Sequence, residues 1–455
     1  MRCVFYLLTA MLCCAHVQAA GTDRQPNIVF VLFDDLGYGQ PPTYRAESPF
    51  STPNFDRLVR EGRRFTDAHS AAANCTPTRY GLLTGRCPSR IGQFGVLKTY
   101  NPPIIPQQRM TVASLLKQQG YHTACVGKWH LGLIWADGKP GSEKKVPVGA
   151  KLTSGPGAIG FDYFCGFTHA GNIGTVIEQD AVLANVEPVE NQPLMLEKAL
   201  QYVEQRATEE KPFFLYFPTC PPHTPIVPAA EFIGRSGVQG KESLYGDWIY
   251  QGDYMLGQLL DALDRHGLAD NTLVIAAGDN GAAHRPYSPL REAKSSIYEG
   301  GHREPFAARW PGRIAAGSEC HQTVCLNDLM ATLADLLEVT LPVDAGEDSV
   351  SILPCLLGSA AQPIREATIH QAPYGLAIRQ GSWKLIFHDA GGQELYNLET
   401  DLSETTDVAD ANPVVVARLT KLFQSYIDRG RSTPGAPQKN EFALGLSGNR
   451  QRGAR

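Results

Sequence analysis

The sequence lacks an excess of positive charge, and this excludes one class of partner. Lys and Arg total 41 against 46 Asp and Glu, which gives a net charge of −5. Proteins that bind nucleic acid usually carry a strongly basic face, whereas the pI of this chain is near 6.2. We therefore expect no nucleic acid partner. Any attraction for an anionic substrate must come from a local cluster of cations.

Beyond the N-terminus, the sequence also lacks the apolar run of about 20 residues that a transmembrane helix needs. The N-terminus combines Arg2, an apolar stretch over residues 4–14, and small residues at Val17 and Ala19, which is typical of a cleaved secretion signal. A buried N-terminal strand is the alternative. We predict a signal peptide over residues 1–20, a secreted or periplasmic location, and no stable membrane anchor.

Paired metal-binding cysteines are missing. Three of the 11 cysteines lie in the predicted signal, and none of the others forms a Cys-x-x-Cys pair, so a zinc knuckle is excluded. The even remainder allows four disulfides, but one cysteine stays unpaired if Cys75 serves chemistry. The only glycosylation sequon, Asn74-Cys75-Thr76, coincides with the motif described below, where a glycan would block the site. This favours a bacterial protein over a glycosylated lysosomal one.

The apolar pattern predicts an α/β fold. Residues 27–33 form a continuous, β-branched apolar run, as in a strand buried on both faces of a parallel sheet. Further strands are expected at 121–126, 212–217 and 272–277, in alternation with helices at 111–119, 194–206 and 243–266. This alternation indicates a large, mostly parallel sheet flanked by helices.

The pattern changes after about residue 345. Short strand-like segments separated by glycine turns indicate a small antiparallel sheet, and Asn412-Pro413 starts a closing helix. We predict a catalytic domain over residues 21–345, a C-terminal α+β subdomain over 346–432, and a mobile tail over 433–455.

Polar groups follow each of the four main predicted strands. In chain order they are Asp34 with Asp35, Lys128 with His130, His223, and Asp279 with Asn280. Ligands of open α/β sheets bind beyond the carboxyl ends of the strands, so we expect one shared site. A single Asp-Asp pair could be a helix N-cap, but two oxygen-donor pairs favour a metal. Three carboxylates and an amide suit Ca²⁺ or Mg²⁺, with Ca²⁺ preferred here.

The most specific segment runs from Cys75 through Pro77 to Arg79 and continues as Leu-Thr-Gly-Arg at 83–86. A cysteine at a helix start near arginine is expected to be reactive on general grounds. A buried structural cysteine is the alternative for the short spacing by itself.

With these motifs the chain resembles the formylglycine sulfatases of the alkaline-phosphatase superfamily, over nearly the whole mature length. The matching segments are Asp-Asp-Leu-Gly-Tyr-Gly at 34–39, the cysteine motif, Gly-Lys-Trp-His-Leu-Gly at 127–132, Pro-Pro-His-Thr-Pro at 221–225, Gly-Asp-Asn-Gly at 278–281, Lys294 with the block at 299–305, and residues 395–404. Gln40 and Thr78 depart from common residues of the family, and neither is a carried-over ligand.

The resemblance implies the fold, the chemistry and the roles of residues. A dedicated enzyme would oxidise Cys75 to formylglycine, whose hydrate attacks sulfur and then expels sulfate. Cys75 would also face the metal held by the Asp and Asn residues named above. Arg79 and Lys128 would stabilise charge, His130 would act as base, and His223 with Lys294 would bind sulfate and protonate the leaving oxygen.

The substrate is less clearly indicated. We expect a sulfated carbohydrate or a similar sulfate ester. His284 and Arg285, in a loop directly after the second metal segment, and His302 are candidate substrate contacts, with a variable surface loop as the alternative. A phosphonate monoester or phosphodiester hydrolase is the alternative enzyme. A non-catalytic, calcium-binding secreted protein is the alternative of another class.

Overall fold

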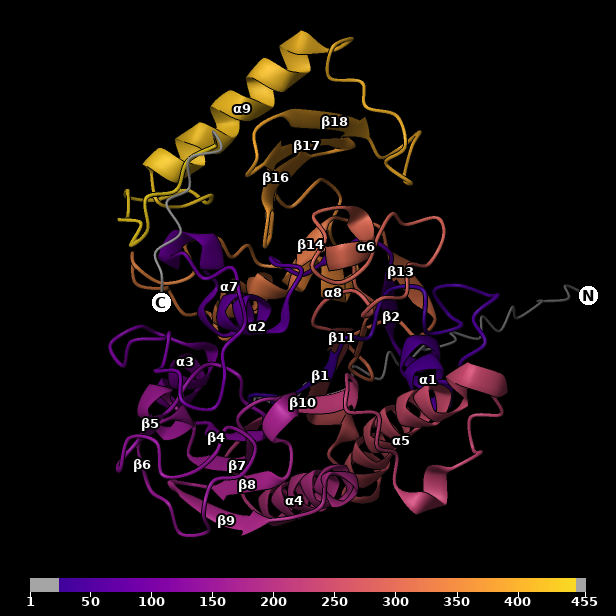
Figure 1. Cartoon of the computed structure of the whole chain (residues 1–455), viewed down its shortest axis with the longest axis vertical. Coiled ribbons are helices and arrows are strands. Elements are labelled where there is room, and N and C mark those ends of the chain that lie inside the picture. Colours follow the sequence, from indigo (N-terminus) through magenta and orange to yellow (C-terminus); the bar gives the residue numbers. More distant parts are fainter. Residues whose placement is uncertain (1–23, 447–455) are drawn as a thin grey trace, which may run out of the picture.

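The structure is a computed structural model that describes residues 24–446. The predicted signal peptide, residues 1–20, lies outside the described residues. The predicted fold class is confirmed: a ten-stranded, mostly parallel sheet carries helices on both faces, and a smaller antiparallel sheet follows (Figure 1). Within the described part, no helix is both long enough and apolar enough to cross a bilayer.

The large sheet has β1 near its centre. From one edge to the other its strands are β13 (Ser318–Cys320), β2 (Arg63–Phe65), β12 (Phe306–Arg309), β11 (Thr272–Gly278), β1 (Asn27–Asp34), β10 (Phe213–Pro222), β4 (His122–Lys128), β7 (Tyr163–Phe167), β8 (Thr175–Glu178) and β9 (Ala181–Asn185). The strands from β11 to β7 run parallel, whereas β12, β8 and β9 join antiparallel to their neighbours. The four predicted strands form its centre.

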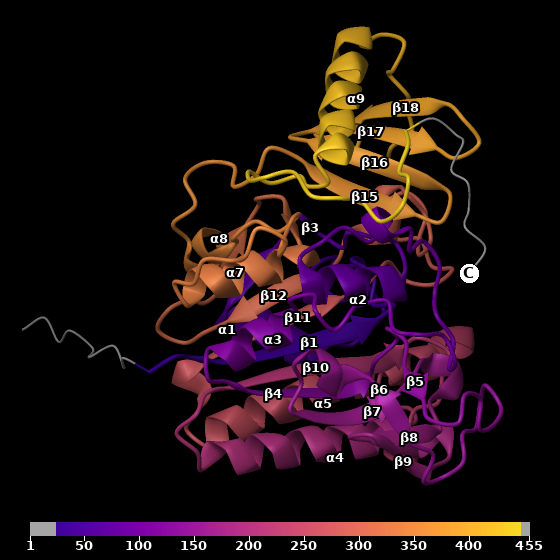
Figure 2. The same ribbon diagram turned by 90° about the vertical axis from the view of Figure 1, so that its left-hand side faces the viewer.

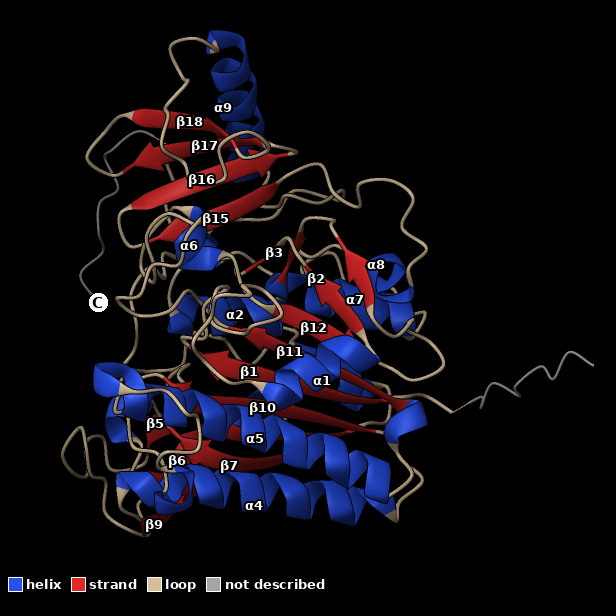
Figure 3. Ribbon diagram, turned by 90° about the vertical axis from the view of Figure 1, so that its right-hand side faces the viewer, coloured by secondary structure: helices blue, strands red, loops and turns tan. Residues whose placement is uncertain are grey.

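Successive side chains of β1 feed two separate cores, because side chains alternate between the faces of a strand. Ile28 and Phe30 pack with residues of α2 (Cys75–Thr84), α3 (Val112–Gln118) and α7 (Leu329–Leu336). Val29 and Val31 pack with residues of α1 (Pro53–Glu61), α4 (Pro188–Ala207) and α5 (Ser243–Arg265). Figure 3 shows α1, α4 and α5 covering this second face. Burial on both faces explains the uninterrupted apolar run.

The C-terminal subdomain is a four-stranded antiparallel sheet covered by one helix (Figure 2). Its strands are β15 (Thr368–Ala372), β16 (Gly375–Gln380), β17 (Trp383–His388) and β18 (Gln393–Asn397), and its helix is α9 (Pro413–Asp428). Leu419 and Phe423 of α9 pack on Leu385 and Phe387 of β17. The sequence predicted this arrangement apart from β15.

The remaining elements are short. They are α6 (Glu299–His302), α8 (Leu353–Leu357), the pair β3 (Ala68–His69) and β14 (Val324–Cys325), and the pair β5 (Ile134–Trp135) and β6 (Leu152–Ser154).

Residues 433–446, part of the tail predicted to be mobile, make contacts with the rest of the chain. The backbone N–H groups of Glu441 and Phe442 donate to the Arg90 carbonyl at 2.8 and 3.0 Å. Phe442 also lies edge-on to Phe94, with ring centroids 6.1 Å apart. This segment therefore packs back onto the catalytic domain, while residues 447–455 lie outside the described part.

Candidate active site

The carboxyl ends of the central strands meet at one edge of the sheet. In the parallel ladder Asp34 pairs with Pro222, and Phe33 pairs with Gly278. Asp34 therefore lies beside the residue that precedes His223, and Phe33 lies beside the residue that precedes Asp279. The structure thus brings the polar groups of these strand ends together, as the sequence predicted.

Cys75 is the first residue of α2 and is buried against this edge. Its Sγ lies within 4.8 Å of side-chain ligand atoms of Asp34, Asp35 and His223, and 3.4 Å from Lys294 Nζ. Burial raises the pKa of the Cys75 thiol to about 12. The thiol is therefore protonated at neutral pH, and the simple expectation of a reactive thiolate does not hold for the unmodified side chain.

Four oxygen-bearing side chains crowd this position. Asn280 Nδ2 donates to Asp35 Oδ1 at 2.7 Å, and Asp279 Oδ1 accepts from the Asp35 backbone N–H at 3.0 Å. The Oδ1 atoms of Asp34 and Asn280 are buried without a hydrogen-bond partner. Burial, together with the charge of Asp34, raises the pKa of Asp279 to about 7.

These observations fit a hard divalent cation. The donor set consists of carboxylate and amide oxygens, which Ca²⁺ and Mg²⁺ prefer, and two of its buried oxygens have no hydrogen-bond partner among the described residues. A cation held by Asp34, Asp35, Asp279 and Asn280 would favour the charged carboxylates, and this would remove the mutual repulsion that raises the pKa of Asp279.

Three basic side chains surround the carboxylates. Arg79 Nη2 lies 2.8 Å from Asp279 Oδ2, and Nη1 donates to the Lys128 carbonyl at 3.0 Å. Lys128 forms a close ion pair with Asp34, and Lys294 Nζ lies 2.5 Å from Asp35 Oδ1. Burial alone would raise the pKa of Asp34, but Lys128, His223 and Arg79 hold it well below its usual range.

Three basic residues therefore balance three carboxylates. A bound divalent cation would make the cluster net positive in a chain whose overall charge is negative. Such a cluster would attract an anionic substrate locally, although the chain as a whole is negatively charged.

His130 lies two residues after the end of β4 and is buried. Its Nε2 lies 2.9 Å from the Leu97 carbonyl, while Nδ1 is buried without a partner. Since a carbonyl can only accept, the proton is assigned to Nε2, which leaves a lone pair on Nδ1. Burial and the nearby Lys128 charge hold the pKa of His130 well below 6.5. A neutral imidazole with a free nitrogen can accept a proton.

His223 directly follows the end of β10. Its Nδ1 lies 2.5 Å from the Thr224 carbonyl, so Nδ1 carries a proton, and its Nε2 faces Asp35 Oδ2 at 3.7 Å. The side chain is 21% exposed, so Nε2 stands between the buried cluster and solvent. Burial lowers the pKa of His223, so in the neutral ring Nε2 is a bare acceptor. It can hand a proton to a departing oxygen only after the ring has taken up a second proton.

The loop that carries His284 and Arg285 packs beside the first metal segment. Arg285 Nε lies 3.0 Å from Glu242 Oε2, and its guanidinium stacks 3.6 Å from the centre of the Tyr245 ring. Tyr245 in turn accepts a hydrogen bond from Gln40 at 2.7 Å. The charge of Arg285 thus already has a partner. His284 is exposed, with φ at 54°.

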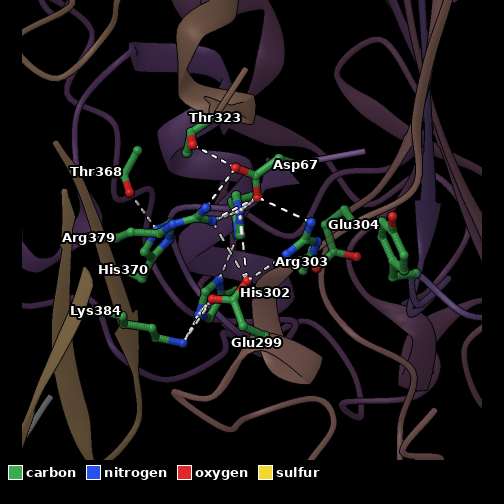
Figure 4. A network of polar contacts seen from close by, with 12 residues as sticks. Asp67, Glu299, His302, Arg303, Glu304, Thr323, Thr368, His370, Arg379 and Lys384 are labelled. Atoms are coloured by element: carbon green, nitrogen blue, oxygen red, sulfur yellow. Dashed lines mark hydrogen bonds and ion pairs between the residues drawn. The ribbon is translucent and has the colours of Figure 1, made fainter. Parts of the chain in front are cut away.

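The structure does not bring His302 to this site, so the prediction that His302 contacts the substrate is wrong. His302 is fully buried, stacked on His370 with ring centroids 4.2 Å apart, and its Nε2 lies 3.1 Å from Lys384 Nζ. Figure 4 shows it inside a polar network between the catalytic domain and the C-terminal sheet, with Glu299 as a central acid. A side chain without exposed surface cannot touch a sugar.

The sequence assigned no role in the site to Glu304 and indicated His169 only as a weaker candidate for substrate contact. Glu304 is buried, with its Oε2 unpartnered, and burial together with Asp279 raises its pKa well above the usual range. His169 stacks on His130 with ring centroids 5.9 Å apart. Glu304 lies inside the matched 299–305 block, which could have pointed to it, whereas nothing about the spacing of His169 distinguishes it from a loop histidine.

Known proteins match the chain along most of its length. A family model described as Sulfatase matches residues 26–339. The chain is 32% identical to N-acetylgalactosamine-6-O-sulfatase of Bacteroides thetaiotaomicron, over 89% of this chain and 94% of that protein. It is 34% identical to arylsulfatase A of Homo sapiens, over 81% of this chain and 76% of that protein.

A solved structure agrees with these matches. It comes from work on the metabolism of multiple glycosaminoglycans by Bacteroides thetaiotaomicron and superposes with a TM-score of 0.78 at 29% identity. The match covers 88% of this chain and 99% of that one. The matches extend along most of the chain, and the expected acidic and basic side chains are present at the sheet edge. The chain belongs to the sulfatase family of the alkaline-phosphatase-like fold and is a sulfuric ester hydrolase.

Proposed function

We propose that this enzyme removes sulfate from a sulfated carbohydrate, using a formylglycine made from Cys75 and one divalent cation, with Ca²⁺ preferred over Mg²⁺. The observation that carries the proposal is the position of Cys75. It lies at the start of α2 within 4.8 Å of two carboxylate ligand atoms and one imidazole, and 3.4 Å from a lysine. The carbohydrate class is supported by the name of the bacterial relative, an N-acetylgalactosamine-6-O-sulfatase.

Formylglycine would supply a hydrated aldehyde, a nucleophile with a built-in route for releasing sulfate, and the cation would supply positive charge beside it. Asp34, Asp35, Asp279 and Asn280 would hold the cation. A formylglycine-installing enzyme of the host is therefore a required partner. We propose that the mature enzyme is secreted or periplasmic.

Side chains of this protein would bind the sulfate group, stabilise the transition state and transfer protons. Lys294 Nζ, 3.4 Å from Cys75 Sγ, lies where it can hold an oxygen of the sulfate group. Arg79 and Lys128 are fully buried, so their charges act in a low dielectric and stabilise an anionic transition state strongly. The free Nδ1 of His130 accepts a proton. His223, once its ring carries protons on both nitrogens beside the anionic sulfate, donates the one on Nε2 to the leaving sugar oxygen.

The test begins with the mass of the peptide that contains Cys75, in protein from the native host. Conversion of the thiol to an aldehyde lowers this mass by about 18 Da. An unmodified thiol in active protein would rule out the formylglycine part of the proposal. Cys75→Ala should abolish activity, and Cys165→Ala, which removes another buried thiol in β7, serves as the control.

The reaction is tested by comparing p-nitrophenyl sulfate with a phosphonate monoester of the same leaving group. We expect the higher kcat/KM with the sulfate ester. A clear preference for the phosphonate would instead assign the enzyme to phosphonate or phosphodiester hydrolysis.

A further inference from the structure

A lysine-lined pocket lies next to the two histidines of the active site. We propose that this pocket binds an anionic group, a carboxylate or a second sulfate, on the sugar adjacent to the one that loses its sulfate. The inference rests on the proposed function and narrows it to polyanionic oligosaccharides.

The pocket is a defined hollow of about 420 Å³. Lys144 and Lys145 line it, together with Gly171, Pro225, Glu187 and Pro188, the first residue of α4. This volume can hold a carboxylate or sulfate group with part of its sugar ring, and the pocket is formed by residues far apart in the sequence.

Two connections place the pocket beside the reacting centre. Pro225 lies two residues after His223, whose Nε2 faces Asp35. Gly171 donates its backbone N–H to His169 Nδ1 at 3.1 Å, and His169 stacks on His130. The wall of the pocket therefore continues the segments that carry both histidines, so a sugar linked to the reacting one can reach it.

The charge of the pocket favours an anion. Lys144 and Lys145 are exposed, and neither has an ion-pair partner among residues 24–446, in contrast to Lys151, which lies 4.0 Å from Asp180. Glu187 also lines the pocket, so two positive charges face one negative charge. The first turn of α4 is already capped by Glu187 and Glu190, so the attraction for an anion comes from the two lysines.

An exposed lysine attracts any anion weakly. An unpaired lysine beside a binding site therefore improves substrate selectivity only where the substrate carries a matching negative charge. Here the cluster around Cys75 takes the reacting sulfate, which leaves the lysine pair for another anion. A monosaccharide with one sulfate leaves the pocket unused, whereas a sulfated sugar linked to a uronate, or to a second sulfated sugar, fills both.

The experiment uses the loaded enzyme and matched disaccharides. In each set the sulfated sugar is linked to a uronate, to a second sulfated sugar, or to the neutral sugar obtained by reducing the uronate carboxyl. Lys144→Ala with Lys145→Ala is compared with wild type and with Lys211→Ala/Lys421→Ala, which removes two exposed lysines elsewhere.

We expect the Lys144/Lys145 variant to raise KM about tenfold for the anionic disaccharides, with kcat little changed. The variant removes two charge contacts, and a tenfold change corresponds to about 1.4 kcal/mol. KM for the neutral disaccharide and for p-nitrophenyl sulfate should stay as in wild type. Whether the uronate or the disulfated set responds identifies the anion. Equal effects on all substrates, or no preference of wild type for anionic disaccharides, would overturn the proposal.

A binding measurement separates failure of the pocket from failure of the proposed function. Calorimetry with a desulfated, uronate-containing disaccharide needs no turnover. Weaker binding to the Lys144/Lys145 variant than to wild type and the control supports the pocket even if no sulfate ester is hydrolysed. Identical binding to all three proteins contradicts it.

Discussion

At the residue scale, the active site is a balance of charges rather than a single reactive group. Lys128 and Arg79 are fully buried and each meets a carboxylate, whereas Lys294 is 16% exposed and reaches both Asp35 and Cys75. Buried pairs also support the fold, because removal of one partner leaves an unpaired charge. Lys294 is therefore the residue whose loss should separate catalysis from stability.

We expect Lys294→Ala to lower kcat for p-nitrophenyl sulfate by about 10²–10³-fold, since it removes one positive group from the position of the transition-state anion. The melting temperature should change by only a few degrees. Steady-state kinetics and thermal unfolding of the purified, formylglycine-bearing protein measure both. Lys421→Ala, on the outer surface of α9, is the charge-matched control. A tenfold or smaller loss of kcat would show that Lys294 has no such role.

The carboxylates lead to a second prediction at this scale. Burial and the charge of Asp34 raise the pKa of Asp279 to about 7, so a cation held by these carboxylates would relieve their mutual repulsion. Removal of the metal should therefore abolish activity and also lower the melting temperature, because a ligand bound only to the folded state stabilises it. Dialysis against EGTA with excess Mg²⁺, followed by added Ca²⁺, distinguishes the ions. Full activity after EGTA with Mg²⁺ present would contradict the preference for Ca²⁺.

At the element scale, α2 must hold Cys75 at the sheet edge, and its far end is fixed by Gly85. This residue caps the helix with φ at 65°, a left-handed conformation that favours glycine. A Cβ there would lie 2.8 Å from Met330 Cβ and 2.9 Å from the Gly346 Cα. Gly381, in the turn after β16, has φ at 58° with nothing within 4 Å of such a Cβ.

This pair separates conformational strain from crowding. Gly381→Ala should cost about 1 kcal/mol of unfolding free energy, from the left-handed backbone alone. Gly85→Ala should cost at least about twice as much, because the new methyl also collides with α7. Urea unfolding followed by tryptophan fluorescence measures both. Equal costs for the two variants would show that the α2–α7 contact adjusts freely.

The elements also show what the sequence could and could not predict. The central strands were predictable because burial on both faces leaves an uninterrupted apolar run, and their polar ends must share one edge. The short strand β2, which lies between β12 and the edge strand β13, contains Arg63 and Arg64 and has no such pattern, so it was missed. His302 was misassigned for a related reason: it neighbours matched residues in the sequence, but the α6 turn points it away from the sheet edge into the domain contact.

At the scale of the whole molecule, the contact between the two domains is a buried polar network (Figure 4). Arg379 of the C-terminal sheet forms two hydrogen bonds with Asp67, at 2.7 and 2.8 Å. Lys384 lies 3.0 Å from Glu299 and 2.7 Å from Glu404. The first pair joins residues 312 positions apart in the sequence, so no local pattern could have predicted it.

This network makes stability depend on pH with a definite sign. His302 and His370 are fully buried, and this burial is the main reason that their pKa values lie well below 6.5. The nearby charge of Lys384 lowers both pKa values further. In the unfolded chain both titrate near 6.5, so the unfolded state takes up protons first as pH falls. The stability that the two neutral rings contribute is therefore present above pH 6.5 and is lost below it.

The acids act in a lower window. Asp67 and Glu299 are buried, and despite this burial Arg379 beside Asp67 and Lys384 beside Glu299 hold their pKa values well below the usual range. Their contribution persists until the pH approaches about 4, where carboxylates of the unfolded chain are protonated. Between pH 7 and pH 5 the histidines should therefore dominate the change.

We expect the free energy of unfolding to fall by up to about 1.4 kcal/mol per pH unit for each such histidine below pH 6.5. His370→Gln should be less stable at pH 8, because it disturbs the stack on His302, but its stability should decline less steeply between pH 7 and pH 5. Urea unfolding at several pH values measures the slopes, and His266→Gln, an exposed histidine at the end of α5, is the control. The same slope in wild type and His370→Gln would mean that these rings take up their protons without unfolding, and the network would then tolerate a charged imidazole beside Lys384.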